Sequence, residues 1–148
     1  LRSETPAEGG KNLSDHQLLV LASMIEKETG TAEDRPLIAG VFHNRLRLGM
    51  KMQSDPTVIY GISNFDGNLT RKHLETPTPF NTYTEMGLPP TPISNPGWDS
   101  LHSALQPASV KYLYFVARGD GSSAFSRTLR EHQRAVWKYQ VQPHRNSR

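Results

Sequence analysis

Two glutamates close the otherwise apolar stretch LASMIEKETG, residues 21–30. Either Glu26 or Glu28 could act as a general acid, because a carboxyl group against apolar walls has a raised pKa and stays protonated near neutral pH. On a helix the two side chains project roughly 200° apart, so they cannot both flank one bond. Glu26 shares its face with small residues that leave room above the carboxylate, and Glu28 lies beside bulkier ones. Periodicity alone favours Glu26 slightly, but the residues leave open which glutamate is catalytic, or whether both form a solvated helix end.

A second group of residues combines amide, hydroxyl and aromatic side chains, which are the types that bind sugars. Aromatic rings cover the apolar faces of a pyranose, while amides and hydroxyls bond to its OH and N-acetyl groups. The candidates are Gln53, Tyr60, Asn81, Thr82 and Tyr83, with Asp55 and Thr57 in the same segment. Each of them could instead stabilise a loop. Asp55, which precedes a proline, is typical of an Asx turn.

Other chemistries lack their motifs in this sequence. The absence of cysteine excludes disulfides, thiol nucleophiles and cysteine-bound zinc. The six histidines show no metal-ligand spacing, and a Gly-x-Ser-x-Gly elbow and Gly-rich phosphate-binding loops are missing. We therefore expect no metal and no cofactor. His132 is predicted to be a surface or packing residue on a helix, with ligand contact as the less favoured alternative.

The composition indicates one globular domain. With 148 residues the chain can bury a sizeable core. Its net charge of +3 would suit an acidic partner, but the basic residues are scattered, so nucleic acid is not expected. The best apolar stretch, residues 18–25, is shorter than the roughly 20 residues that a membrane span requires. We expect a flexible lead-in at residues 1–12 and a single domain over residues 13–148.

The glutamates and the sugar-binding candidates must be positioned by helices at the start of this domain. A first helix is predicted after Ser14, which forms a capping box with Gln17, and Gly30 should end it as the residue beyond the cap. A second helix should begin near Asp34 and end at Gly49. Residues 50–61 are predicted to form a strand and turn.

The second half of the chain is expected to be less regular. Seven of the eleven prolines fall between Pro77 and Pro107, so residues 77–97 are predicted to form a long, functional Pro-rich loop. A short helix should run from Asn95 to Leu105. A hairpin is expected over residues 111–126 and a last helix over residues 128–139. These elements predict an α+β fold with N-terminal helices, a small and mostly antiparallel sheet, the Pro-rich loop and a C-terminal helix.

Six stretches of the sequence together resemble a known enzyme family. In chain order they are LASMIEKETG, VFHNRLRLGMKMQSDPTVIYG, PFNTY, GLPPTPISNPG, YLYFVARGDG and a closing EH. This combination resembles the endolytic murein transglycosylases, also called MltG or YceG-like proteins. The resemblance covers nearly all of residues 13–139, and SDPTVIYG and ETPTPFNTYTEMGLPP are similar to Gram-negative members. Thr91 replaces an expected glycine, and Ser123 stands where members often have histidine, which argues against an essential histidine at that position.

The resemblance implies a lyase that cleaves the MurNAc–GlcNAc β-1,4 bond inside peptidoglycan strands and leaves 1,6-anhydro-MurNAc ends. Members use the first glutamate of a Glu-x-Glu pair, which is Glu26 here. They are anchored in the inner membrane and act at its periplasmic face, so this chain would be the catalytic domain without its anchor. Glycan strands would be its substrate, and the peptidoglycan synthases of elongation and division are candidate partners.

The implied reaction fits a single carboxyl group. A hydrolase of the usual kind needs two carboxylates, whereas in a lytic transglycosylase the C6 hydroxyl of the sugar is the nucleophile. One glutamate can then protonate the glycosidic oxygen and later accept the C6 hydroxyl proton. Two alternatives remain open. The chain could be a non-catalytic glycan-binding module, or an aminodeoxychorismate lyase that uses pyridoxal phosphate, although no lysine has the sequence context of a Schiff base.

Overall fold

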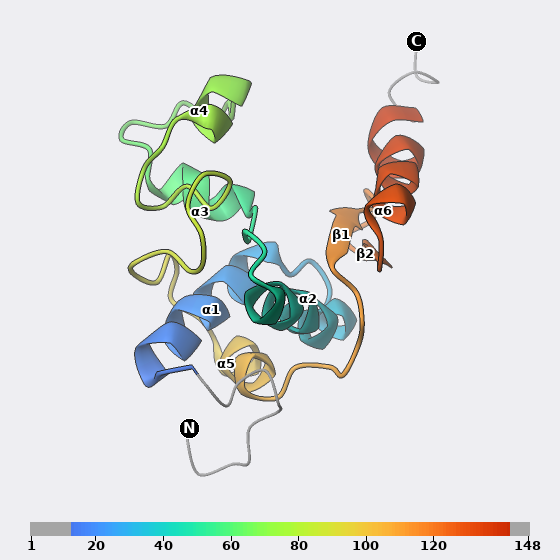
Figure 1. Ribbon diagram of the computed structural model, residues 1–148, viewed down its shortest axis with the longest axis horizontal. Coiled ribbons are helices and arrows are strands. Elements are labelled where there is room, and N and C mark those ends of the chain that lie inside the picture. The colour runs from blue at the N-terminus through green and yellow to red at the C-terminus, as the bar shows by residue number, and fades with distance from the viewer. Residues whose placement is uncertain (1–12, 143–148) are drawn as a thin grey trace.

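Helix α1, Asp15–Glu28, is the centre of the fold because most of its residues are apolar or small. The computed structural model describes residues 13–142, and in it the seven residues of α1 that are buried include all of those from Val20 to Ile25. Ser14 and Gln17 cap the helix reciprocally, as expected. Helices α2, Arg35–Leu48, and α5, Trp98–Leu105, pack against α1 at the base of the molecule (Figure 1). The expected lead-in at residues 1–12 lies outside the described residues.

Helix α1 ends where the chain must pass close to the β-hairpin. The C-cap is Thr29, whose backbone is extended and whose N–H and hydroxyl both donate to the Ile25 carbonyl. Gly30 follows the cap, as predicted, but its role is steric. A Cβ atom at Gly30 would overlap the Gly121 carbonyl oxygen. The glycine therefore allows the C-terminal end of α1 to lie against the hairpin.

The predicted bounds of α2 are confirmed. A single turn of 3₁₀-helix, η2, Ala32–Asp34, leads into it, and Pro36 lies in its first turn. Gly49 ends the helix in the left-handed conformation, with φ of 70°. Ile38, Ala39 and Phe42 join the core formed by α1. Helix α5 begins at Trp98 with Gly97 as its N-cap, three residues later than the predicted start at Asn95.

The strand predicted within residues 50–61 is wrong. Asp55–Tyr60 form a short helix, α3, with Pro56 in its first turn, where its fixed φ favours a helix start. A second short helix, α4, Arg71–Glu75, was not predicted, although Thr70 and His73 form a capping box around it. Residues 76–97 contain turns and bends without helix or strand.

The C-terminal part of the described chain is a hairpin covered by a helix. Strand β1, Tyr114–Ala117, pairs antiparallel with β2, Ser123–Ser126, and Gly119 and Gly121 adopt positive φ in the turn. Helix α6, Leu129–Val136, begins after Thr128 and continues as one π-helical segment, η3, Trp137–Val141. The expected hairpin, final helix and α+β class are confirmed.

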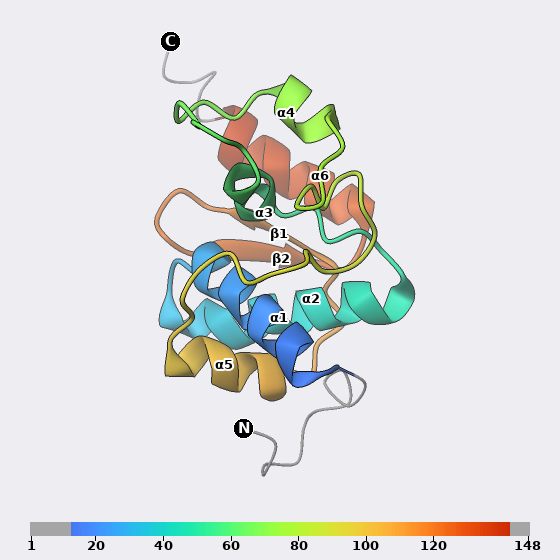
Figure 2. The same ribbon diagram turned by 90° about the vertical axis from the view of Figure 1, so that its left-hand side faces the viewer.

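The elements form a base with two arms. Helices α1, α2 and α5 make the base, α3 and α4 with their loop rise on one side, and the hairpin with α6 rises on the other (Figure 1). The view turned by 90° shows β1 and β2 behind α3, with α6 beyond them (Figure 2). Among residues 13–142 no helix is long and apolar enough to cross a membrane.

Candidate active site

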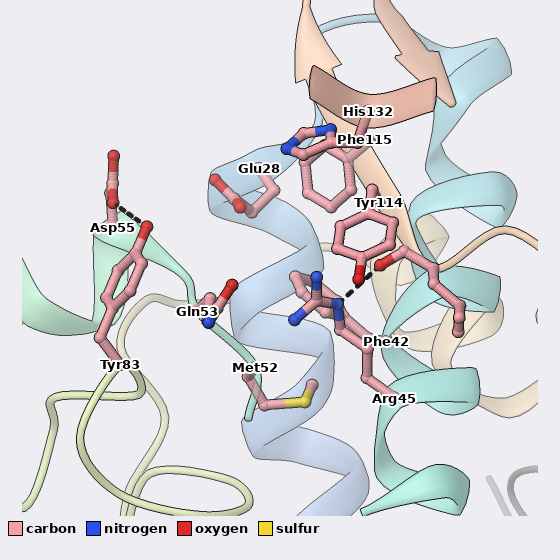
Figure 3. A pocket seen from close by; sticks show the side chains of 11 residues that line it. Glu28, Phe42, Arg45, Met52, Gln53, Asp55, Tyr83, Tyr114, Phe115 and His132 are labelled. Carbon is pink, nitrogen blue, oxygen red and sulfur yellow. Dashed lines mark hydrogen bonds between the residues drawn. The ribbon is translucent and has the colours of Figure 1, made fainter. Parts of the chain in front are cut away.

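A pocket of about 320 Å³ lies where the base meets the two arms. Its lining residues come from α1, α2, the start of α3 and the segment before it, the loop after α4, β1 and the residue before it, and α6 (Figure 3). They are Glu28, Phe42, Arg45, Met52, Gln53, Asp55, Tyr83, Leu113, Tyr114, Phe115 and His132. Segments far apart in sequence therefore converge on one small, mixed polar and aromatic space.

Glu28, the last residue of α1, points its carboxyl group into this pocket (Figure 3). Burial disfavours the charged form, and the nearby charge of Asp55 adds to this effect, so the pKa of Glu28 is raised to about 7 from an ordinary 4.5. A large share of the molecules therefore carries a protonated Glu28 at neutral pH. The folded protein binds this proton more tightly than the unfolded chain does. The protonated carboxyl therefore contributes to the stability of the fold fully below about pH 4.5, and this contribution is lost as the pH rises through about 7.

Asp55 and Tyr83 form one wall of the pocket. The Tyr83 hydroxyl donates to Asp55 Oδ1 at 2.6 Å, and the pair faces Glu28 across the opening (Figure 3). Burial, the hydrogen bond to Asp55 and the negative charges of Asp55 and Glu28 raise the pKa of Tyr83 above its usual range. The phenol therefore stays protonated, and it donates its proton to Asp55.

The opposite wall is a stack of three side chains that the sequence did not single out as a group. The Arg45 guanidinium lies 4.9 Å from the centre of the Tyr114 ring, and His132 stacks on the same ring at 4.9 Å with an interplanar angle of 19°. Arg45 is fixed by Nε donating to the Leu113 carbonyl and Nη1 donating to the Lys51 carbonyl, at 2.7 and 2.6 Å. This arrangement ties α2, β1 and α6 together beside Glu28.

His132 carries hydrogen-bonding capacity that the described residues do not use. Its Nδ1 atom is buried and has no hydrogen-bond partner among residues 13–142. Burial and the neighbouring Arg45 charge lower the pKa of His132, so the ring is neutral at neutral pH. A neutral imidazole whose Nδ1 is buried contributes to the pocket wall by stacking on Tyr114. His132 therefore packs on Tyr114 at the edge of the pocket, in line with its predicted packing role, and contact with a ligand stays a prediction.

Gln53 reaches the pocket from a strained backbone. Its φ is 50°, which is unusual for a residue other than glycine. The conformation is held by the backbone N–H groups of Gln53 and Ser54, which donate to the Thr82 carbonyl and the Thr82 hydroxyl. Such strain persists where the surroundings over-determine it, and it is common at functional sites. Among the predicted sugar-binding residues, Gln53, Asp55 and Tyr83 line the pocket.

Thr57 and Thr82 lie behind the pocket wall. Both are buried, and their hydroxyl oxygens are 2.8 Å apart. The Thr57 hydroxyl also donates to the Ser54 carbonyl at 2.7 Å. This pair joins α3 to the loop that carries Tyr83. The two threonines therefore position pocket residues and do not line the pocket themselves.

Asn81 is also fully buried. Its amide nitrogen donates to the carbonyls of His73, Leu74 and Thr76, and its Oδ1 atom accepts from the Tyr83 N–H at 2.9 Å. It closes the end of α4 and holds the backbone of Tyr83. Tyr60 lies elsewhere: its side chain is 52% exposed, contacts Phe80 and does not line the Glu28 pocket.

Glu26 is held outside the pocket as a helix cap. Its Oε1 atom accepts from the Gly97 N–H at 2.9 Å and from the Ser100 hydroxyl at 3.0 Å, at the N-terminus of α5. The backbone hydrogen bond from Gly97, followed by the bond from Ser100, lowers the pKa of Glu26. This environment stabilises a carboxylate anion. It suits a structural role and does not favour a group that must donate a proton.

The burial argument of the sequence analysis applies to Glu28 better than to Glu26. Glu28 follows the bulky face of α1, where apolar walls raise a carboxyl pKa, and that signal was visible in the sequence. In the part of the chain that the structure describes, no cluster of three or more histidine, aspartate or glutamate side chains could hold a metal ion.

With this geometry established, comparisons with known proteins identify the family. The model of the YceG-like family matches residues 2–138, and the chain belongs to that family. This chain is similar to the crystal structure of a YceG-like protein from Listeria monocytogenes, with a TM-score of 0.76 and a sequence identity of 45%. The match covers 84% of this chain and 40% of that one.

Two curated relatives carry the name endolytic murein transglycosylase. The Bacillus subtilis protein is 45% identical over 127 residues, covering 86% of this chain. The Streptococcus pneumoniae protein is 36% identical over 132 residues, covering 85% of this chain. The chain spans about a third of the first relative and a quarter of the second, with 35% and 24% covered.

Replacing Asn81 by alanine should destabilise the domain by about 2–3 kcal/mol, because it removes a buried group that bonds to four backbone atoms. Chemical denaturation measures this change. Asn68→Ala, at an exposed asparagine, is the matched control and should change stability by less than about 0.5 kcal/mol. Unchanged stability of Asn81→Ala together with weakened glycan binding would return Asn81 to a direct role in substrate binding.

Proposed function

We propose that this domain is the catalytic part of a peptidoglycan lytic endotransglycosylase. It cleaves the MurNAc–GlcNAc β-1,4 bond within glycan strands and leaves 1,6-anhydro-MurNAc ends. One observation carries the proposal: the carboxyl group of Glu28 lies in a pocket with aromatic walls, and its pKa is raised to about 7. The names of the Bacillus and Streptococcus relatives support the substrate class.

Glu28, in place of Glu26, is the proposed general acid and base. In the first step its proton passes to the glycosidic oxygen as the bond from that oxygen to C1 of MurNAc breaks. The C6 hydroxyl of the same sugar then attacks C1, and the Glu28 carboxylate accepts the hydroxyl proton. The new C1–O6 bond closes the anhydro ring, and Glu28 ends the cycle protonated. A pKa near 7 serves both steps.

The remaining pocket residues are proposed to bind and orient the sugar. Gln53 supplies an amide, and Tyr83 supplies an aromatic face with its hydroxyl committed to Asp55. Asp55 places a negative charge across the pocket from Glu28, where it can stabilise the developing oxocarbenium ion. On the opposite wall, His132 and Tyr114 present stacked rings that can pack against the substrate. Thr57, Asn81 and Thr82 support these residues from behind.

The alternatives fit the pocket less well. Among residues 13–142, none of those that line the pocket is a lysine that could form a Schiff base with pyridoxal phosphate. A non-catalytic binding module would have no need for a carboxyl whose pKa is raised to about 7. The substrate lies outside the cytoplasmic membrane, so we place the reaction at the periplasmic face of the inner membrane. Peptidoglycan synthases are the proposed partners of the whole protein.

Glu28→Gln should lower the cleavage of isolated sacculi by at least 10²–10⁴-fold, because the amide keeps the shape of the side chain but cannot supply an acidic proton. Glu26→Gln is the matched control on the same helix. It retains an oxygen that can accept from Gly97 and Ser100, so activity should stay within a few-fold of the unchanged protein. The release of soluble muropeptides measures both. Inactive Glu26→Gln beside active Glu28→Gln, with both proteins folded, would restore Glu26 as the acid.

The products should be muropeptides that end in 1,6-anhydro-MurNAc, each lighter by one water than the reducing form. Attack by the C6 hydroxyl is intramolecular, which gives it a high effective concentration relative to water. Mass spectrometry of the digest distinguishes the two forms. Reducing MurNAc ends, together with an inactive Asp55→Asn variant, would instead show a hydrolase in which Asp55 is the second carboxylate. Glycan binding without any product would show a binding module.

A further inference from the structure

A second hollow lies along α1 and α3 and shares no lining residue with the Glu28 pocket. It consists of two adjoining depressions of about 340 and 360 Å³, both of which are lined by Tyr60 and Ile93. Leu19 and Asn95 lie in the first and Lys27 in the second. We call this combined hollow the Tyr60 groove. Each of its halves is at least as large as the pocket that contains Glu28.

The Tyr60 groove adjoins the Glu28 pocket at two places in the chain. Lys27 lines the groove, and the next residue, Glu28, lines the pocket. Pro56 lines the groove, and the preceding residue, Asp55, lines the pocket. Consecutive Cα atoms are about 3.8 Å apart, so the end of α1 and the start of α3 together form a narrow seam between the two hollows. The two hollows therefore lie on either side of this seam, close enough for one glycan strand of several sugars to reach both.

The side chains of the groove have the chemistry of a saccharide site. Tyr60 is 52% exposed, and Phe80 contacts its ring at a centroid distance of 5.1 Å. Leu19, although apolar, is 38% exposed beside it. Asn95 and Lys27 add an exposed amide and an exposed cation. An aromatic platform with an amide and a cation suits a sugar that carries N-acetyl and carboxylate groups.

We propose that the Tyr60 groove is a distal subsite that binds the glycan strand at sugars remote from the cleaved bond. Its ligand is a β-1,4-linked chain of N-acetylated hexoses, with one pyranose stacked on Tyr60. Lys27 pairs with a carboxylate on the strand, either of a lactyl group or of a peptide stem. This inference rests on the proposed function. It also gives that function a physical basis for cutting in the strand interior, because a long strand gains contacts that a short fragment cannot reach.

The test compares the affinities for long glycan strands and for a MurNAc–GlcNAc tetrasaccharide, measured by calorimetry in the Glu28→Gln background so that nothing is cleaved. The added Tyr60→Ala change should reduce the ratio of long-strand affinity to tetrasaccharide affinity by about twofold to tenfold, as expected for loss of one exposed aromatic contact. Tyr60→Phe should keep the ratio. Trp98→Ala, at an aromatic residue that is 62% exposed and lines neither hollow, is the matched control and should also keep it.

An unchanged ratio in Tyr60→Ala would overturn the subsite, as would an equal loss of affinity for both ligands. The result is independent of cleavage. If the unchanged protein released no anhydro product, the proposed reaction would fail, whereas a length-dependent loss of affinity in Tyr60→Ala would still establish the groove as a glycan-binding site.

Discussion

The structure depends on holding one carboxyl group in a partly enclosed pocket at the end of a buried helix. Helix α1 is covered along most of its length by α2 and α5, and its last residue, Glu28, extends into the pocket. The two arms complete the enclosure. Asp55 and Tyr83 close one side, while Tyr114 and His132 close the other (Figure 3). The desolvation that raises the Glu28 pKa is therefore a property of the whole fold.

Much of the hydrogen bonding in the arms serves this enclosure. Thr57 and Thr82 hold the loop against α3, and Asn81 fixes the backbone of Tyr83. Arg45, buried in the base, donates to backbone carbonyls on both sides of the pocket. Glu26 contributes from the opposite face of α1 by capping α5. The pKa values of two glutamates in the same helical turn are thus shifted in opposite directions, because one accepts hydrogen bonds and the other is desolvated.

The sequence predicted the elements whose ends carry local signals. Ser14 with Gln17, Gly49 and the hairpin glycines marked boundaries that the structure confirms. It did not predict α3, because six residues rich in β-branched side chains are also typical of a strand, and only the position of Pro56 favours a helix start. The steric role of Gly30 could not be inferred, since it depends on the distant residue Gly121.

The candidate site was likewise predictable only where residue types alone point to it. The sugar-binding composition selected Gln53, Asp55 and Tyr83, which line the pocket, but it also selected Thr57, Asn81 and Thr82, which are buried. Polar side chains that bind a ligand and those that support a loop have the same composition, and only burial separates them. The grouping of Arg45, Tyr114 and His132 was missed because these residues meet through packing between α2, β1 and α6.

The most direct test of this account is a site-resolved titration of the Glu28 carboxyl group by NMR, with ¹³C-labelled glutamate and the Glu28→Gln variant to assign the resonance. The account predicts a midpoint near pH 7 for Glu28 and a midpoint below 4.5 for Glu26. A Glu28 carboxyl that titrates near pH 4.5, with Glu26 protonated at neutral pH, would contradict it.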